Sequence, residues 1–304
     1  MESILKFLPK VRGQYKEHAP LANFSWFKVG GPADVLFLPA DTNDLSNFLI
    51  NKPAKLELNI LGLCSNIIIR DKGISGCVVK LGQGFREVFV KDRLVKVGCG
   101  LDNYHLVSFL LEQGLTGLEF LSGVPGSVGG AVVMNAGCCG CEVKDFLISV
   151  EAVNKKTGKV VQISVKDLFL EYRHNSMAND FIFTNATFLL DFEKDQNKMR
   201  ENIKKISKMK LASQPIGEKT GGSIFKNPDQ KISKYKAWEL IDRAGFRGYV
   251  FGGAKISKKH TNFLINTGKA TAKELEGLGE LVRTKVKEKF DINLEWEIKR
   301  IGSI

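Results

Sequence analysis

The sequence predicts an α+β protein of two domains joined by a helix. Between residues 34 and 190, short runs of β-branched and apolar residues alternate with stretches of helical period. Residues 193–210 are charged and helical in period, but they supply few residues for a core. We therefore predict domains over residues 22–192 and 208–304, with residues 193–207 as a helical connector.

In the first domain, apolar runs bounded by turns predict the regular elements. Strands are expected at residues 35–38, 58–61 and 67–69, each beside a glycine-rich turn. A helix is expected over residues 102–113. Its apolar face is predicted to comprise Leu106, Phe109, Leu110 and Gln113.

In the second domain, helices are expected over residues 237–244 and 271–290, and a strand over residues 262–266. Thr271 and Glu274 have the spacing of a capping box, which marks the start of the longer helix. This helix is expected to pack on a sheet, because apolar residues recur at helical spacing: Leu275, Leu278, Val282 and Val286.

Length and composition place the chain among soluble globular proteins. It has 304 residues, of which 43% are hydrophobic, enough for about two cores. No apolar run approaches the roughly 18 residues of a membrane span. Residues 1–10 also lack the apolar stretch of a signal peptide. We therefore expect a cytoplasmic protein without a membrane partner.

The chain is basic, with a formal net charge of +12. Such a charge is typical of nucleic-acid-binding proteins. However, the lysines are spread along the chain, with local clusters at 198–210 and 255–259, and no aromatic residues are interleaved with them. We interpret the charge as solvated surface that also attracts anionic small molecules, and we expect no nucleic-acid partner.

Six cysteines stand at positions 64, 77, 99, 138, 139 and 141. The local pattern Cys-Cys-x-Cys has no companion histidines, so we expect no metal site. A disulfide framework is equally disfavoured in a cytoplasmic protein. The cysteines are therefore predicted to be reduced thiols.

Residues 123–137, GVPGSVGGAVVMNAG, form a loop dense in glycine. Glycine permits positive φ, and successive bare N–H groups form a concavity that binds anions such as a diphosphate. The spacing fits neither a P-loop nor a Rossmann fingerprint. A simple glycine-rich turn between strands is the open alternative.

Two further glycine-containing turns lie upstream, at residues 27–34 and 61–76. In the latter, Ser65 and Asn66 offer hydroxyl and amide groups beside exposed backbone, which suits a phosphate or a ribityl chain. Three such turns within about a hundred residues indicate one extended ligand.

Several segments together resemble the UDP-N-acetylenolpyruvoylglucosamine reductase family, the flavoenzymes of peptidoglycan precursor synthesis. They are FKVGGPAD at 27–34, GLCSN at 62–66, GLTGLEFLSGVPGSVGGA at 114–131, YRH at 172–174 and GSIFKNP at 222–228. The resemblance runs in order from about residue 22 to residue 302. It implies an FAD-binding domain of the p-cresol methylhydroxylase type, followed by a smaller α/β substrate-binding domain. It also implies a role in cell wall biogenesis, cell shape and cell division.

The same resemblance implies non-covalent FAD, with NADPH as reductant and a UDP-sugar enolpyruvyl ether as substrate. The implied FAD-binding residues are Gly62, Cys64, Ser65, Asn66, Asp71, Gly123, Pro125, Gly126, Ser127, Gly129, Gly130, Asn135 and Gly137. The implied substrate-binding residues are Tyr172, Lys226 and Asn227.

Three catalytic residues are implied. Arg173 would hold the enolpyruvyl carboxylate, which suits a planar and permanently charged guanidinium. Ser223 would protonate the substrate carbon after hydride transfer from FAD N5. Residues 294–300 alternate between apolar and charged, which predicts a half-buried strand. On it, Glu297 fits the family's catalytic glutamate better than Glu295 and would stabilise the enolate.

The chain departs from the family pattern in places. The short spacing from Arg173 to Ser223 indicates the shorter subtype, which lacks a substrate-closing tyrosine loop. Cys64 and Trp296 stand where a small residue and a proline are more usual, and residues 137–141 are also atypical. We expect a monomer.

Two other classes of protein remain possible at this point. One is an alcohol-oxidising flavoenzyme of the same superfamily, often with covalent FAD. The four histidines, at 18, 105, 174 and 260, lie outside the glycine loops at 61–76 and 123–137, which disfavours it. The other is a basic binding module that carries no flavin at all.

Overall fold

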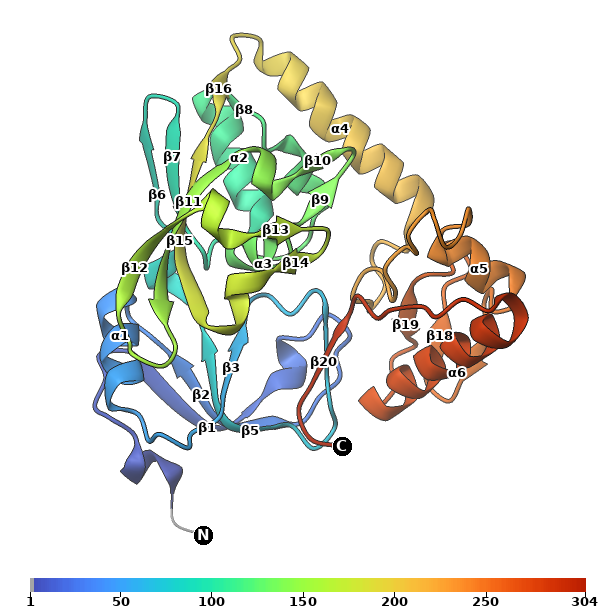
Figure 1. Ribbon diagram of the computed structural model, residues 1–304, viewed down its shortest axis with the longest axis horizontal. Coiled ribbons are helices and arrows are strands. Elements are labelled where there is room, and N and C mark those ends of the chain that lie inside the picture. Colours follow the sequence, from blue (N-terminus) through green and yellow to red (C-terminus); the bar gives the residue numbers. More distant parts are fainter. Residues whose placement is uncertain (1–2) are drawn as a thin grey trace. The chain divides into compact units, whose positions relative to one another are not determined.

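The computed structural model describes residues 3–304 (Figure 1). The α-helices are α1 (Thr42–Asn51), α2 (Asn103–Gln113), α3 (Val128–Val133), α4 (Gln196–Ser213), α5 (Ala237–Arg243) and α6 (Ala272–Phe290). The 3-10 helices are η1 (Ile4–Phe7), η2 (Leu21–Asn23), η3 (Gln83–Phe85), η4 (Glu119–Gly123), η5 (Val143–Asp145), η6 (Val165–Leu168) and η7 (Ser176–Asn179). The strands are β1 (Gln14–Pro20), β2 (Pro32–Leu38), β3 (Leu58–Leu61), β4 (Ile67–Ile69), β5 (Ile74–Lys80), β6 (Val88–Lys91), β7 (Leu94–Gly98), β8 (Leu115–Thr116), β9 (Gly137–Cys138), β10 (Cys141–Glu142), β11 (Leu147–Asn154), β12 (Val160–Ser164), β13 (Leu170–Glu171), β14 (His174–Asn175), β15 (Phe181–Leu189), β16 (Asp191–Phe192), β17 (Val250–Phe251), β18 (Ala254–Ile256), β19 (Leu264–Asn266) and β20 (Lys299–Ile301).

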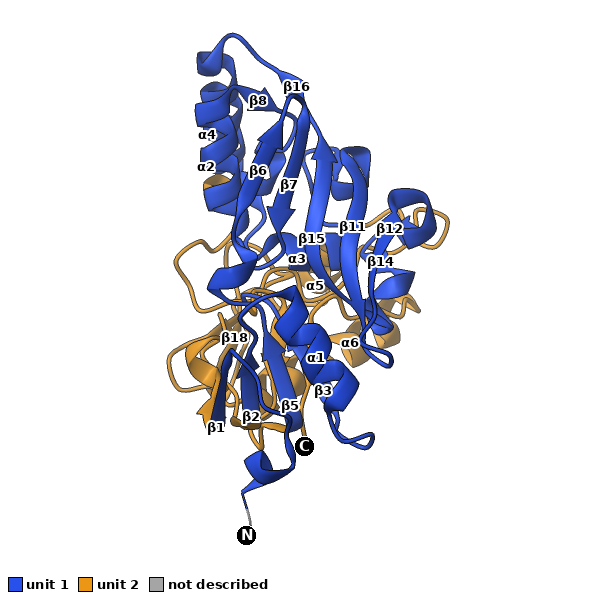
Figure 2. Cartoon of the chain, turned by 90° about the vertical axis from the view of Figure 1, so that its left-hand side faces the viewer, with its two compact units in different colours: residues 1–17, 35–63, 76–209 blue, residues 18–34, 64–75, 210–304 orange. Residues whose placement is uncertain are grey.

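The chain divides into two compact units (Figure 2). Unit 1 comprises residues 1–17, 35–63 and 76–209, and unit 2 comprises residues 18–34, 64–75 and 210–304. The predicted domains were continuous stretches, whereas both units are assembled from separated segments. The predicted connector helix exists as α4, and most of its length is grouped with unit 1.

Unit 1 is centred on an antiparallel sheet of order β12-β11-β15-β7-β6. Apolar side chains of β7, β11 and β15 share one core with those of α2 and α3. Asp102 caps the start of α2 by accepting from the His105 N–H at 3.0 Å, and Gly114 ends the helix at φ +66°. The predicted apolar face of α2 was wrong at one position, because Gln113 is exposed and Val107 is buried instead.

A second sheet has the order β1-β2-β5-β3, in which β3 and β5 run parallel. A hydrophobic core lies between helix α1 and the part of this sheet that belongs to unit 1. It includes Phe37 and Phe48, whose ring centroids are 4.5 Å apart. The buried carboxylate of Asp44 accepts hydrogen bonds from the N–H groups of Arg12, Gly13 and Ala40 at 2.8–2.9 Å. It therefore fastens the segment that precedes β1 to helix α1.

Unit 2 contains the sheet β17-β18-β19 and the parallel pair β4-β20. The predicted face of α6 is confirmed, since Leu275, Leu278, Val282 and Val286 are all buried in the core that also includes β18 and β19 residues. The Thr271–Glu274 capping box is confirmed too. Asp71 adds a second cap, because its carboxylate oxygens accept from the N–H groups of Ala272 and Lys273 at 2.8 and 2.9 Å.

The strand predicted over residues 294–300 is only partly regular. Strand β20 begins at Lys299, and among residues 294–298 Trp296 makes one isolated bridge, to Phe225, in place of a ladder. Leu294 and Ile298 are buried, and Trp296 and Glu297 are half-buried. Among residues 3–304, no helix combines the length and apolar character needed to cross a membrane.

Candidate active site

The glycine loop at 123–137 folds around the short helix α3, whose first N–H groups are already bonded within the protein. The N–H of Val128 donates to the Leu101 carbonyl and that of Gly129 to the Cys99 carbonyl, both at 2.9 Å. Gly130 and Ala131 donate to Ser127, which is the N-cap. The expectation that this loop leaves its N–H groups bare was therefore wrong for residues 128–131.

The glycines here allow close backbone approach instead. A Cβ on Gly129 would lie 3.0 Å from the Cβ and carbonyl oxygen of Cys99. A Cβ on Gly62 would lie 2.8 Å from the Ser127 hydroxyl oxygen. The second contact brings two predicted cofactor-binding residues, Gly62 and Ser127, together within unit 1.

Two buried polar atoms beside this loop lack a hydrogen-bond partner in the described part of the chain. They are the Ser122 hydroxyl and the side-chain oxygen of Asn103. The Asn103 amide nitrogen donates to the Val124 carbonyl at 2.9 Å, and its backbone N–H donates to the Gly126 carbonyl at 3.0 Å. Because buried polar groups are normally satisfied, these atoms fit a bound group rich in donors and acceptors, such as FAD. Sequence reasoning missed both residues, although Ser122 directly precedes Gly123.

Asn135 is fully buried at φ +38°, and its side chain is satisfied by the protein itself. Its amide nitrogen donates to the Glu142 carboxylate at 3.0 Å and to the Glu171 carbonyl at 3.2 Å. Its oxygen accepts from the Lys144 N–H at 3.0 Å. Asn135 therefore ties the end of the glycine loop to the segment that carries Arg173.

Arg173 lies in the two-residue turn between β13 and β14, at φ +57°. A positive φ is uncommon for a residue other than glycine and is often found at functional sites. The guanidinium carbon lies 5.0 Å from the ring centroid of Tyr172. Its nitrogens donate long hydrogen bonds to the carbonyls of Asn135, at 3.5 Å, and Gly137, at 3.4 Å. The structure thus brings Tyr172 and Arg173 to the end of the glycine loop.

In unit 2, the predicted cofactor-binding residue Asn66 contacts the segment that carries Glu297. Its side-chain nitrogen donates to the Glu297 carbonyl at 3.1 Å, and its own carbonyl accepts from the Lys299 N–H at 3.0 Å. Cys64 is buried at φ +53°, which accounts for the usual preference for a small residue at this position.

The structure places Ser223 and Glu297 on paired segments of unit 2. The N–H of Glu297 donates to the carbonyl of Ile224 at 2.8 Å, and the N–H of Lys226 donates to the carbonyl of Glu295 at the same distance. Gly222, at φ +79°, has open space where a Cβ would stand. The two predicted catalytic residues therefore lie on neighbouring segments that are joined by backbone hydrogen bonds.

The predicted substrate-binding residues Lys226 and Asn227 make contacts nearby in unit 2. Lys226 and Glu295 form an ion pair at 3.5 Å. The side-chain oxygen of Asn227 accepts from the N–H of Ala237 at 3.1 Å, which caps helix α5. Arg173 belongs to unit 1, whereas Ser223 and Glu297 belong to unit 2.

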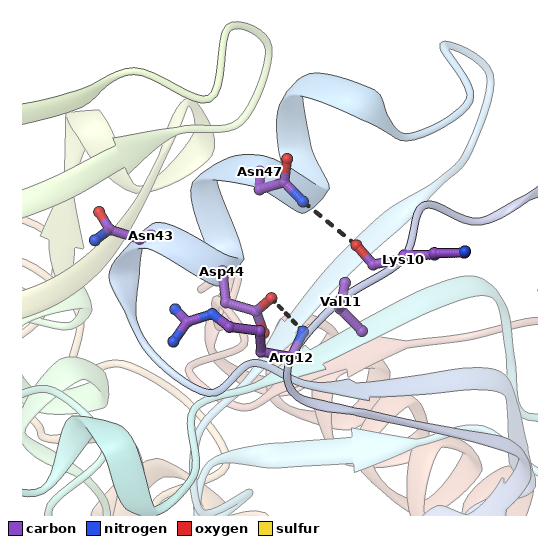
Figure 3. Close-up of a pocket in the computed structure, with 6 residues that line it drawn as sticks. All are labelled: Lys10, Val11, Arg12, Asn43, Asp44 and Asn47. Carbon is purple, nitrogen blue, oxygen red and sulfur yellow. Dashed lines mark hydrogen bonds between the residues drawn. The ribbon is translucent and has the colours of Figure 1, made fainter.

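A cavity of about 340 Å³ lies elsewhere in unit 1 (Figure 3). It is lined by Lys10, Val11, Arg12, Asn43, Asp44 and Asn47. None of these residues belongs to the predicted site. The hydrogen bonds drawn there join the N-terminal segment to α1, so we assign these residues a structural role.

Comparison with known protein families identifies the cofactor. Residues 33–164 match the model of an FAD-binding domain, and residues 214–301 match that of the UDP-N-acetylenolpyruvoylglucosamine reductase C-terminal domain. The first match includes the glycine loops at 61–76 and 123–137. The fold and this match define an FAD-dependent oxidoreductase, and the predicted fold class is confirmed.

Whole-chain relatives then identify the family. Proteins named UDP-N-acetylenolpyruvoylglucosamine reductase from Azorhizobium caulinodans and Orientia tsutsugamushi are 46% and 44% identical, each over 97% of this chain. The matches cover 94% and 97% of those relatives. The crystal structure of the reductase from Thermus caldophilus superimposes with a TM-score of 0.81 at 29% identity, covering 96% of this chain and 100% of that one. The chain belongs to the UDP-N-acetylenolpyruvoylglucosamine reductase family, as its sequence motifs predicted.

Proposed function

We propose that the protein reduces UDP-N-acetylglucosamine enolpyruvate to UDP-N-acetylmuramate, with NADPH as the reductant, in cytoplasmic peptidoglycan precursor synthesis. The main support is identity of 44–46% to the named reductases over 97% of the chain. The pairing of the Ser223 and Glu297 segments is the structural observation that supports it further.

In unit 1, the residues that would hold FAD are Gly62 and those of the glycine loop at 123–137, together with Ser122 and Asn103. When bound, FAD supplies the hydride transfer from NADPH to the methylene carbon of the substrate. Ser122 and Asn103 bring buried polar atoms that a ligand would satisfy. Asn135 and Asp71 are assigned a positioning role, because their side chains are bonded to Glu142 and to the start of α6.

Arg173 would hold the enolpyruvyl carboxylate. A guanidinium forms two parallel hydrogen bonds to a carboxylate and stays charged at every relevant pH. The long hydrogen bonds of Arg173 to backbone carbonyls, at 3.4 and 3.5 Å, are weak and are readily exchanged for a charged partner.

Ser223 would donate the proton that completes the reaction, at the carbon next to the carboxylate. A serine hydroxyl is a poor acid, so it needs a strongly basic acceptor and a partner for the charge that develops. Glu297 would be that partner, in a protonated or hydrogen-bonded form that stabilises the enolate.

An anaerobic mixing experiment tests this function. NADPH should bleach the flavin absorbance, and subsequent addition of the enolpyruvyl substrate should restore it as the lactyl ether forms. Recovery of flavin colour without the lactyl product would contradict the proposed reaction.

The purified protein should also be precipitated under denaturing conditions. Flavin in the supernatant supports non-covalent FAD. Yellow colour in the pellet would favour an alcohol-oxidising flavoenzyme, and a colourless protein would favour a binding module.

A further inference from the structure

Three cysteines occupy one β-hairpin of unit 1, whose turn is exposed and whose strands are half-buried. Strands β9 and β10 are antiparallel, with Cys138 directly opposite Cys141. The two turn residues, Cys139 and Gly140, both have positive φ, +58° and +87°. Positive φ at both central residues is typical of the tight type I′ hairpin, which keeps the strands in register. Within the pattern Cys-Cys-x-Cys, Cys138 and Cys141 have C-x-x-C spacing.

The hairpin geometry suits a disulfide between Cys138 and Cys141. Directly opposed residues of an antiparallel pair have Cα atoms about 4.5–5.5 Å apart. Disulfides span Cα separations of about 4.4–6.8 Å. Adjacent residues are only about 3.8 Å apart, which is too short for an unstrained bridge between Cys138 and Cys139.

Cys139 is the exposed member of the cluster. Its sulfur lies 3.3 Å from that of Cys138, so a reaction at Cys139 is within reach of Cys138. The cysteines at 64, 77 and 99 are buried. Burial raises the pKa of the Cys77 thiol to about 12 and also raises the pKa of Cys99, so these thiols are poor nucleophiles.

The hairpin is connected to the proposed active-site arginine. The carbonyl of Gly137, the residue before Cys138, accepts a hydrogen bond from Arg173. Glu142, the residue after Cys141, accepts from Asn135, which in turn donates to the carbonyl of Glu171. Both strands of the hairpin therefore contact groups that fix the turn carrying Arg173.

We propose that this hairpin is a thiol oxidation site that closes a Cys138–Cys141 disulfide and so lowers the activity of the enzyme. Hydrogen peroxide would oxidise the Cys139 thiol to a sulfenic acid, releasing one water. The Cys138 thiol would displace a second water and form a transient bond to Cys139. Partial burial raises the pKa of Cys141, so its thiol would lose the proton as it attacks the Cys138 sulfur. Cys139 would leave and take up that proton.

The net reaction consumes one peroxide and two thiols and gives one disulfide and two waters. Transient disulfides of this kind are compatible with a reducing compartment, where thioredoxin-type reductants would reopen them. The effect on activity rests on the proposed function, because it acts through Arg173.

Differential alkylation tests the chemical step on the purified holoenzyme. After treatment with hydrogen peroxide, Cys138 and Cys141 should resist a thiol-alkylating reagent, whereas Cys139 should still react. Dithiothreitol should restore labelling of all three. Stable protection of Cys138 with Cys139, sulfinic acid at Cys139, or unchanged labelling of all three would each overturn the proposal.

Two matched variants test which cysteines form the disulfide and which thiol reacts first. Cys141→Ala should abolish the stable disulfide, and Cys139→Ala should retain it but form it more slowly. If Cys141→Ala still loses two thiols to a stable bridge, the assigned pair is wrong. If Cys139→Ala is oxidised as fast as the natural protein, Cys139 is not the first thiol to react.

Activity is measured on the same samples. The oxidised enzyme should turn over about 10- to 100-fold more slowly, since a displacement of about 1 Å in a positioned group can cost about 10²-fold. Dithiothreitol should restore the rate, and Cys141→Ala should be insensitive to peroxide. A disulfide that leaves the rate unchanged would overturn the link to Arg173. Failure of the proposed function would instead appear as no turnover before oxidation, with the labelling result unaffected.

Discussion

At the scale of single residues, Ser223 carries the sharpest expectation. Replacing it with alanine removes only the proposed proton donor, so NADPH should still bleach the flavin at nearly the normal rate. Reoxidation by the enolpyruvyl substrate should slow by about 10²- to 10⁴-fold, the usual contribution of a positioned general acid. This corresponds to roughly 3–5 kcal/mol of barrier.

Stopped-flow absorbance measures both half-reactions of Ser223→Ala in one series. Glu297→Gln serves as the companion variant and should show the same asymmetry, because the proposal has it stabilise the enolate. Equal slowing of both half-reactions would mean that Ser223 shapes the site rather than donating a proton.

Residue types near a glycine loop are predictable from sequence, but the directions of their side chains are not. Asp71 and Asn135 both stand in segments that suggest cofactor binding, yet the structure directs them to α6 and to Glu142. Ser122 and Asn103 show the reverse, since their unsatisfied atoms become visible only when burial is known. Hydrogen bonds between segments distant in the sequence decide these roles, and a local sequence pattern does not predict such bonds.

At the scale of elements, the segment that carries Glu297 is fastened to α6 by Glu280. The Trp296 ring nitrogen donates to the Glu280 carboxylate at 2.9 Å, and Arg300 donates to the same oxygen at 2.8 Å. Gly279 leaves room for the indole, since a Cβ there would lie 2.1 Å from the Trp296 ring. Partial burial of Glu280 opposes ionisation, but hydrogen bonds from Trp296 and Arg283 outweigh it and lower the pKa of Glu280.

Glu280→Gln should therefore destabilise the protein by about 1 kcal/mol near neutral pH, because hydrogen bonds to a charged partner are replaced by neutral ones. The folded pKa of Glu280 lies below its ordinary value of 4.5, so the stabilisation is complete above that value. It is lost as the pH falls through the folded pKa.

Urea unfolding of the holoenzyme from about pH 7 to about pH 4 checks this, and the difference from the natural protein should shrink in acid. Glu288→Gln is the matched control on the same helix, since Glu288 pairs with Lys285 in an exposed contact. An equal effect at Glu288, or a Glu280 effect that grows in acid, would contradict the assignment.

Elements with strong local signals were predictable. Helix α6 combines a capping box with apolar residues at helical spacing, and both features are confirmed. Residues 294–298 alternate like a strand, but they bridge to residues 224–226 at isolated points and lack a continuous partner strand. Alternation predicts which side chains are buried, whereas a ladder also requires a neighbour of matching length.

At the scale of the whole molecule, the proposed reaction predicts ping-pong kinetics. One pocket beside the flavin would serve the nicotinamide first and the enolpyruvyl substrate second, so NADP would leave before the second substrate binds. Double-reciprocal plots of initial rate against substrate concentration, at several fixed NADPH concentrations, should then be parallel. Substrate inhibition at high concentration would agree with a shared pocket, and intersecting lines would show a required ternary complex.

The division of the chain was the part of the fold least accessible to sequence reasoning. Apolar periodicity locates elements, but it does not show that residues 18–34 and 64–75 are grouped with residues 210–304. Those groupings depend on long-range pairs such as β4 with β20 and on the Asp71 cap of α6. Both involve residues about two hundred positions apart, beyond any local signal.

This arrangement also sets the order in which the nascent chain can fold. Phe27 and Val29 emerge early from the ribosome, but the core that buries them includes Ile224, Leu240 and Leu275. At about 5–20 residues per second, these three partners follow roughly 10–50 s later. Until then most of the core that buries these side chains is missing, so this early segment is one place where the growing polypeptide benefits from chaperone protection.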